Sequence, residues 1–553
     1  MAASLRFREP DPRDIAKFPT RKSPKQRSRK WRWIAGIFLV LALICAFGLW
    51  YAASHVSPIL RARVIDTLSD RFKGKVELAG LEVSAFNGLA VHGTGLTIYG
   101  MNDPNPSAPG LQPLIKVEEF RFQTSFRAVF RSPMHVHTVF VKGLTLNIPP
   151  KEDIQDLSDI RKSSHRMTIV VDELNCEDTN LVINTRKPGK QPLVFAISHL
   201  KMEDIGAGQP MRFHATLVNP KPVGDIASVG YFGPFQETRP RATPVSGDYS
   251  FSNADLGNFR GIAGILSSVG DYRGTLGRIE VAGETDTPDF RLTRSGHPVP
   301  LHTDFHAIVD GTDGDTYLEP VNAKFLHTSF TASGKVVRVQ PKGHDIELNV
   351  VMNQGRVEDL LRLGVKTDPP VLSGPIVMHA KMGLPPSDED IADRLRLNGT
   401  FSITNAEFSN DKIQDRLDAL SLRAQGHPNL AQEHVDVNVP SKFSGTFHLS
   451  NGLFQFLKME FALPAVESQF TGQYSLDGNV FDFHGKLRLR AKLSQMTTGW
   501  KSILLKPVDP FFAKHGAGTE LPFKITGTKS EPHFGLDFGH HDAEAEGKPN
   551  PTQ

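Results

Sequence analysis

Cysteine is nearly absent from this sequence, with two residues among 553. Cys45 lies inside a long apolar segment, and Cys176 lies far downstream, in the part of the chain expected to be soluble. The two residues would occupy different environments, so we expect no disulfide framework. No catalytic partner residues surround Cys176, and we interpret it as a small packing residue.

A strong net charge is also missing. Lys and Arg number 63 against 60 Asp and Glu, for a formal net charge of +3. The basic excess is concentrated in residues 1–32, which hold eleven Lys or Arg and three acidic residues. The rest of the chain is therefore slightly acidic, which argues against a nucleic-acid partner.

Motifs that carry chemistry are absent as well. The sequence has no Gly-x-Ser-x-Gly and no glycine-rich phosphate loop. His135 and His137 would share one side of a strand, but the sequence offers no evident third metal ligand. Ser198 and Lys201 match a Ser-x-x-Lys pattern without its companion motifs. We therefore predict a protein that is not an enzyme, with no catalytic residue, no metal ligand and no cofactor.

One long apolar segment is present, at residues 33–53, and it contains no charged residue. A helix of this length spans roughly 30 Å, the thickness of a bilayer core. Trp31 and Trp33 lie at one end of the segment, and Trp50 and Tyr51 at the other, as expected of aromatic anchors in the headgroup layers. We predict a transmembrane helix over 33–53.

Basic residues flanking this segment predict its orientation. The 20 residues before Trp33 contain nine Lys or Arg, and the 20 residues after Ala53 contain four. The positive-inside rule then places residues 1–32 in the cytoplasm and the bulk of the chain outside it. A cleaved signal peptide is the alternative, but its apolar region is usually about 7 to 15 residues long, shorter than this one.

Beyond the span, residues 55–72 predict an amphipathic helix, and then apolar and polar residues alternate. Such alternation is typical of strands with one apolar and one wet face, whereas a sheet buried on both faces gives continuous apolar runs. We predict a mainly β chain of long antiparallel sheets with a few amphipathic helices. The alternating runs are residues 144–148, 346–352, 395–403, 435–439, 443–449, 470–476 and 481–493.

Helical spacing of apolar residues predicts three later helices, over residues 253–270, 411–422 and 496–514. Residues 219–245 contain five prolines and predict a long irregular insert.

An internal echo links two segments. Residues 247–255 and 399–407 are both alternating strands that end in Asn-Ala-acid. We interpret them as one strand-then-helix module used twice.

The apolar face of the sheet must be covered by something. We predict that it forms an elongated groove lined for acyl chains, with 36 phenylalanines against seven tyrosines supplying rings without polar groups. The alternative is that the same side chains form the closed core of a β-sandwich. The expected lining residues are Leu395, Leu397, Phe401, Ile403, Phe443, Phe447, Phe481, Phe483, Leu487 and Leu489.

Several segments resemble AsmA-like proteins. Near the start they are residues 75–83 (KVELAGLEV) and 89–98 (LAVHGTGLTI). Residues 219–226 and 285–290 in the middle are also similar to members of that group, and the closing segment is GAGTELPFKITGT at 516–528. The order of these segments after the membrane span carries the resemblance.

The resemblance implies a single-pass inner-membrane protein with a periplasmic β-groove related to chorein-type bridge proteins. The implied partners are the membrane, phospholipid acyl chains and an envelope protein, in outer-membrane assembly or lipid transport. A non-catalytic scaffold that binds other proteins is the alternative, and an envelope hydrolase would need a pair of carboxylates. The expected parts are a basic tail at 1–32, the span at 33–53, modules at 54–150, 164–340 and 341–538, and a disordered tail at 539–553.

The predicted orientation is testable with topology reporters. A reporter that is active only outside the cytoplasm, fused after Asp70, should be active, and one fused before Trp31 should be inactive. The reverse pattern of activities would overturn the predicted topology.

Overall fold

The structure is a computed structural model, and its contacts divide the chain into two units, Met1–Leu60 and Arg61–Gln553. The described residues are 39–41, 43–44, 61–62, 64–66, 68–69, 74–84, 89–99, 113–125, 128, 133–148, 169–184, 192–206, 208–236, 239–294, 297–339, 343–366, 368–432, 439–476, 480–497, 506, 518–528 and 532–537.

Several predictions concern residues that lie largely outside this described part. Of the predicted span 33–53, only residues 39–41, 43 and 44 are described, and they are helical. Among the described residues, no helix is both long and apolar enough to cross a membrane. Seven described residues between 61 and 69 are helical, within the expected amphipathic helix. The predictions that lie outside the described residues are Trp31, Trp33, Trp50, Tyr51, the tails at 1–32 and 539–553, the strand at 435–439 apart from its last residue, and most of the helix at 496–514.

The second unit is dominated by one sheet of 24 strands. Its strands are β1 (Val76–Ser84), β2 (Leu89–Ile98), β3 (Ile115–Thr124), β4 (Met134–Ile148), β5 (Ile169–Ile183), β6 (Leu193–Ile205), β7 (Met211–Pro220), β8 (Val223–Phe232), β9 (Pro244–Asp255), β10 (Ile262–Ala263), β11 (Ile265–Thr275), β12 (Arg278–Leu292), β13 (Val299–Val309), β14 (Thr316–Phe325), β15 (Thr328–Val339), β16 (Gly343–Arg356), β18 (Pro375–Leu384), β19 (Arg396–Thr404), β21 (Lys442–Ser450), β22 (Leu453–Leu463), β23 (Val466–Ser475), β24 (Phe481–Leu489), β25 (Thr519–Gly527) and β26 (Pro532–Leu536). A second sheet pairs β17 (Leu372–Ser373) with β20 (Glu407–Phe408).

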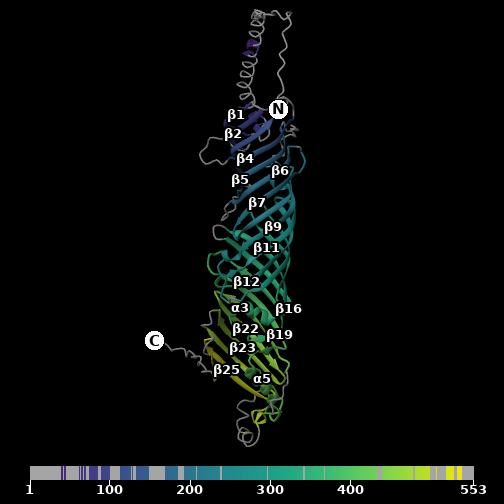
Figure 1. Ribbon diagram of the computed structural model, residues 1–553. Coiled ribbons are helices and arrows are strands. Elements are labelled where there is room, and N and C mark those ends of the chain that lie inside the picture. The colour runs from purple at the N-terminus through teal and green to yellow at the C-terminus, as the bar shows by residue number, and fades with distance from the viewer. Residues whose placement is uncertain are drawn as a thin grey trace, which may run out of the picture. The chain divides into compact units, whose positions relative to one another are not determined.

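Strands of the large sheet pair in chain order, so the sheet grows strand by strand along the sequence (Figure 1). Neighbouring strands pair antiparallel, with the exception of β4 and β5, which run parallel. The short strand β10 pairs beside β11 on β12. The prediction of a mainly β, antiparallel chain is confirmed.

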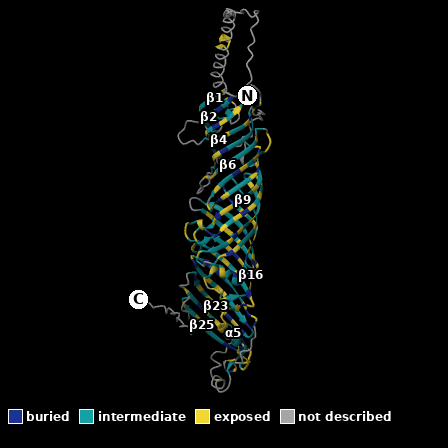
Figure 2. Ribbon diagram, in the orientation of Figure 1, coloured by how far each residue is buried: buried dark blue, intermediate teal, exposed yellow. Residues whose placement is uncertain are grey.

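The two faces of the strands differ as the alternation predicts. Along β24, Phe483 and Leu489 are buried, whereas Lys486 and Arg488 are exposed. Figure 2 shows the same alternation of exposed and less exposed residues along many strands. The predicted strand 481–493 is too long, however, because β24 ends at Leu489 and the chain turns into the 3-10 helix η6 (Leu493–Met496).

Among the described residues after Gly74, helices are few and short, as expected. The α-helices there are α3 (Val357–Gly364), α4 (Ile391–Arg394) and α5 (Asp411–Ala424). The helix predicted over 411–422 is confirmed by α5, whose first turn is capped by the side chain of Asn410, which accepts from the Ile413 N–H. Such a cap satisfies a donor that the helix itself leaves unpaired.

The helix predicted over 253–270 is wrong. The chain there completes β9, makes the single 3-10 turn η4 (Leu256–Asn258), and continues through β10 into β11. Four glycines lie in this stretch, and Gly261 and Gly264 adopt positive φ angles of 102° and 139°. Each glycine disfavours a helix by roughly 1 kcal/mol relative to alanine, so the helical spacing of apolar residues does not prevail.

Two further expectations need correction. The insert expected over 219–245 contains β8 and the start of β9, because its prolines stand at strand ends and in turns rather than inside a paired strand. Leu395, expected in a strand with its neighbours, is instead the C-cap of α4 and donates its N–H to Ile391.

The two similar segments, 247–255 and 399–407, both form strands that end in the same backbone conformation. Asn253 and Asn405 both adopt positive φ, at 56° and 49°, and the alanine after each is buried. Asparagine tolerates this left-handed conformation better than most residues. Only the second copy continues into a full α-helix, α5.

Phenylalanine rings lie over glycines of neighbouring strands. Gly472 is paired with Phe483, and a Cβ added at Gly472 would lie 2.2 Å from Cδ1 of that ring and 2.4 Å from the Asp482 carbonyl oxygen. Gly399 faces the ring of Phe447 in the same way. These glycines leave the space that the large rings occupy.

Replacing Gly472 with alanine should therefore lower the free energy of unfolding by about 1 to 3 kcal/mol, as overpacking does. Gly364 is the matched control, because a Cβ there meets no atom within 4 Å. Gly364→Ala should be neutral or stabilise by up to about 1 kcal/mol. Thermal or denaturant unfolding of both variants checks this, and equal stabilities would contradict the packing argument.

Candidate functional site: the apolar face of the sheet

Cross-strand register brings the predicted lining residues onto one face. Paired residues of adjacent strands point to the same side of a sheet. One row of paired residues runs across β19 and β21 to β25, through Ile403, Phe443, Phe461, Ser468, Leu487 and Leu521. A second row follows Leu397, Leu449, Phe454, Tyr474 and Phe481. All the predicted lining residues except Leu395 lie on this shared face.

Aromatic rings make this face continuous from strand to strand. The ring centroids of Phe401 and Phe443 are 5.1 Å apart, and those of Phe443 and Phe470 are 6.1 Å apart. Phe470 in turn lies 5.9 Å from Phe523 on β25. Ring pairs at these separations contribute about 0.5–1.5 kcal/mol each beyond the area they bury. A chain of contacts thus connects β19 to β25.

Two helices pack against parts of this face. Leu360 and Leu361 of α3 belong to a cluster with Ile376 and Ile403, which also includes Phe401 and Phe443. Leu417 and Leu420 of α5 pack in a second cluster with Val466, Leu487 and Leu489. Five of the predicted lining residues therefore form part of a core beneath a helix: Phe401, Ile403 and Phe443 beneath α3, and Leu487 and Leu489 beneath α5.

Outside both clusters, Phe447 and Phe483 are buried as well, but three other aromatic residues are less covered. Phe454, Phe456 and Phe481 are only partly buried, and none of them belongs to the clusters beneath α3 and α5. The described residues contain one large sheet and one pair of two-residue strands, so no second large sheet packs against this face as a sandwich would require.

Hydroxyl groups interrupt the apolar face at its middle. The Tyr272 hydroxyl bonds Ser228 at 2.7 Å, and the Ser228 hydroxyl donates to the Asp248 carbonyl at 2.9 Å. Tyr249 bonds Ser268 at 3.0 Å, and Ser268 donates to the Glu284 carbonyl. We call these the tyrosine–serine relays.

All four hydroxyl groups of the relays donate their protons to acceptors within the protein. Because each serine donates to a carbonyl, each tyrosine is the donor to its serine. Burial raises the pKa of both Tyr249 and Tyr272, so both phenols stay protonated. Ser268 and the first part of β11 fell within the helix predicted over 253–270, so sequence reasoning did not place these hydroxyls on one sheet face.

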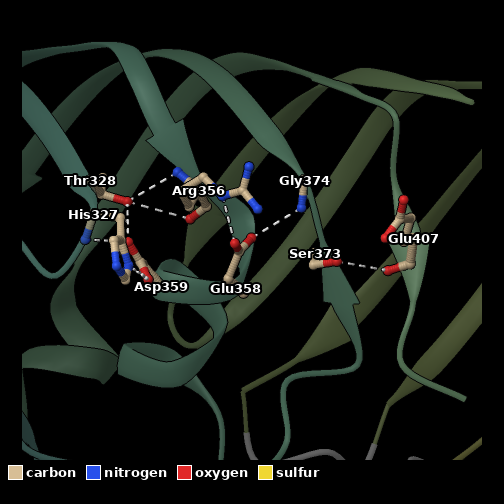
Figure 3. Close-up of polar contacts among 8 residues, drawn as sticks. All are labelled: His327, Thr328, Arg356, Glu358, Asp359, Ser373, Gly374 and Glu407. Atoms are coloured by element: carbon tan, nitrogen blue, oxygen red, sulfur yellow. Dashed lines mark hydrogen bonds and ion pairs between the residues drawn. The ribbon is translucent and has the colours of Figure 1, made fainter.

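Helix α3 is fixed by two carboxylates at its first turn, of which Asp359 is buried. Asp359, 5% exposed, accepts the Thr328 hydroxyl at 2.8 Å and the His327 N–H at 2.9 Å (Figure 3). Glu358 bonds the Arg356 Nε at 2.6 Å and the Gly374 N–H at 3.0 Å. Burial opposes ionisation of Glu358, but hydrogen bonds from backbone N–H groups and Arg356 outweigh it and lower its pKa.

Among the described residues, one group brings three potential metal ligands together: Glu284, His302 and Asp304 lie with ligand atoms within 4.8 Å of one another. His302 Nδ1 is 2.8 Å from Asp286, and its Nε2 is 3.6 Å from Asp304. A histidine held between carboxylates accounts for this geometry on an exposed surface. The sequence did not reveal the group, because its members come from two different strands.

The other sequence candidates have ordinary environments. His135 and His137 both lie near Asp172 on the neighbouring strand, at 3.8 and 2.6 Å. Lys201 pairs with Glu173 and Glu203, whose hydrogen bonds raise its pKa and oppose a role as a base. Cys176 is buried, and burial raises the pKa of its thiol to about 12, as suits a packing residue.

Comparison of the chain with protein-family models, curated proteins and solved structures found no match in any of the three.

The pKa of His302 is raised, mainly by its hydrogen bond to Asp286, although slight burial opposes the shift. Replacing Asp286 with asparagine should therefore lower the midpoint of the His302 titration, measured by NMR and assigned with His302→Gln. A raised folded-state pKa stabilises the fold below the unfolded value of about 6.5 and loses that effect as pH rises through the folded value. The stability difference between wild type and Asp286→Asn should accordingly be larger at pH 5.5 than at pH 9. An unchanged midpoint would contradict the assignment.

Proposed function

We propose that this protein binds or conducts phospholipid along the apolar face of its sheet, as a single-pass inner-membrane protein with an AsmA-like periplasmic β-groove that contributes to outer-membrane assembly or lipid homeostasis. The observation that carries the proposal is the two rows of paired residues that run from Leu397 and Ile403 on β19 to Phe481 and Leu487 on β24 and are apolar except at Ser468 and Tyr474. Acyl chains are ligands that such a face accommodates without hydrogen bonds.

The order of the strands supports a path rather than a single pocket. Successive strands pair in chain order, and neighbouring strands lie about 4.8 Å apart. The large sheet therefore extends over roughly 100 Å along the direction of pairing. That distance exceeds the roughly 30 Å core of a bilayer, so the sheet is long enough to hold several acyl chains in succession along one face.

The chemistry of the face also suits an acyl ligand. The phenylalanine and leucine side chains that make up most of these rows present no polar atom that would need a partner, and large apolar surfaces left in water mark interaction sites. The tyrosine–serine relays keep their protons bonded to the protein, so they add no unsatisfied donor that acyl chains would leave unpaired.

A scaffold that binds other proteins is the second candidate. On the opposite face, Val229 and Tyr231 of β8 are 40% and 53% exposed, and Val269 of β11 is 49% exposed. Exposed aromatic and aliphatic side chains of this kind are found at protein interfaces. Stoichiometric recovery of one protein partner in the absence of lipid would favour this candidate.

Adjacent residues of β22 provide a matched test. Phe454 lies on the apolar face, outside the clusters beneath α3 and α5, and Gln455 points to the other face and is exposed. Phe454→Asp places a charge where acyl chains are expected, which costs several kcal/mol without a partner. We expect this variant to lose most of the phospholipid that co-purifies with wild type, as measured by native mass spectrometry.

Gln455→Asp is the control and should retain wild-type lipid, because exposed substitutions usually change stability by about 0.5 kcal/mol or less. Circular dichroism reports whether each variant is folded. Equal lipid retention by two folded variants would remove the proposed function. Unfolding of Phe454→Asp alone would show that the face at this point is a closed core.

A further inference from the structure

A pocket of about 360 Å³ lies where several strands of the large sheet begin or end. It lies between His327, the residue before β15, the first residues of β18, and the last residues of β16 and β19. No acidic side chain is among its lining residues. Its polar lining consists of His327, Asn353, Gln354, Arg356, Ser402 and Thr404.

An irregularity in β16 creates the pocket. The pairing of β16 with β18 shifts between Met352 and Gly355. A Cβ at Gly355 would lie 2.3 Å from the Met352 sulfur, so only glycine fits there without displacement. Asn353 and Gln354 are exposed at the shift. Bulges of this kind redirect side chains and are common beside functional sites.

Arg356 is held in a fixed orientation at this pocket. Its Nε donates to Glu358, and the other oxygen of Glu358 accepts from Gly374 (Figure 3). The Nε bond leaves the two Nη groups as donors for a further acceptor. Arginine placed in this way recognises phosphate or carboxylate with two parallel bonds.

His327 stands at the rim, with its side chain 84% exposed and its Nδ1 3.7 Å from the buried carboxylate of Asp359. The carboxylates of Glu358 and Asp359 are not among the lining residues. The lining side chains offer a guanidinium, an imidazole, two amides and two hydroxyls. Every one of these groups can donate a hydrogen bond. A pocket of this volume, near the small end of ligand sites, suits a compact anion rich in acceptors.

The pocket also adjoins the apolar face. Ile376 lines the pocket and is part of the cluster of Met352, Ile403 and α3. An amphiphile with an anionic group in the pocket would have its apolar part beside this cluster.

We propose that this pocket binds a phosphate group, carried either by a phospholipid headgroup or by a small soluble phosphate ester. The lipid form rests on the function proposed above, and the phosphate site itself does not.

The test titrates the full-length chain, purified in detergent and phosphate-free buffer, with glycerol 3-phosphate, inorganic phosphate and glycerol, by calorimetry. We expect glycerol 3-phosphate to bind and uncharged glycerol not to bind. Arg356→Gln should weaken binding about tenfold or more, because a hydrogen bond to a charged group contributes about 1.5–3 kcal/mol. Arg362→Gln is the matched control on α3, where the arginine is exposed and outside the pocket, and it should bind as wild type does.

His327→Gln is a second test of the site in case Arg356→Gln does not fold. The His327 side chain is exposed, so its replacement should not disturb the core. It should weaken binding several-fold. The proposal is overturned if no phosphate binds wild type at millimolar concentration, or if folded Arg356→Gln and His327→Gln both bind as tightly as wild type.

Two further experiments distinguish a lipid headgroup from a soluble phosphate ester, and the phosphate site from the proposed lipid-binding face. Phosphatidylglycerol in mixed micelles should displace glycerol 3-phosphate if the ligand is a headgroup, and failure to displace it identifies a soluble ester. Phe454→Asp should leave glycerol 3-phosphate binding unchanged. Failure of the apolar face to hold lipid is therefore distinguishable from failure of the phosphate site.

Discussion

Each strand of the large sheet has one side that water solvates and one side that it does not, and burying the second side is the constraint on which the rest of the structure depends. Helices α3 and α5 cover two parts of the apolar face. Elsewhere the face is filled by its own rings, which lie over glycines such as Gly472 and Gly399. Phenylalanine and glycine thus form a single layer that is dense without a second sheet.

Periodicity predicted the strands and the face of each side chain, because alternation is a local property of the backbone. Along β24 it distinguishes Leu487 from Arg488 correctly. Periodicity failed at 253–270, where apolar residues at helical spacing coincide with four glycines that favour turns and an extended chain. Periodicity cannot predict contacts between residues that are far apart in the sequence. Asp359 meets Thr328 across 31 residues, and Tyr272 meets Ser228 across 44.

The face is not uniform along the chain, and the difference is chemical. From β19 to β25 it consists mainly of phenylalanine and leucine, whereas Tyr249 and Tyr272 introduce hydroxyls on β9 and β11. Buried hydroxyls destabilise a fold when they lack partners. Here each phenol donates to a serine that donates to a backbone carbonyl of an adjacent strand. Polar atoms on this face therefore link strands instead of weakening it.

Helix α3, which covers part of the apolar face, and the pocket that contains Arg356 both involve the Glu358 carboxylate. Glu358 lies in the first turn of α3, bonds the backbone of Gly374, and orients Arg356. Asp359, the next residue, fastens the same turn to Thr328. An anion bound by the Nη groups of Arg356 leaves the Nε bond to Glu358 in place, and Glu358 belongs to the first turn of the helix that packs on Ile376 and Ile403. Binding at the proposed phosphate site would therefore be linked to α3 through Glu358, and a ligand with both a charge and an acyl chain would contact both the pocket and the apolar face.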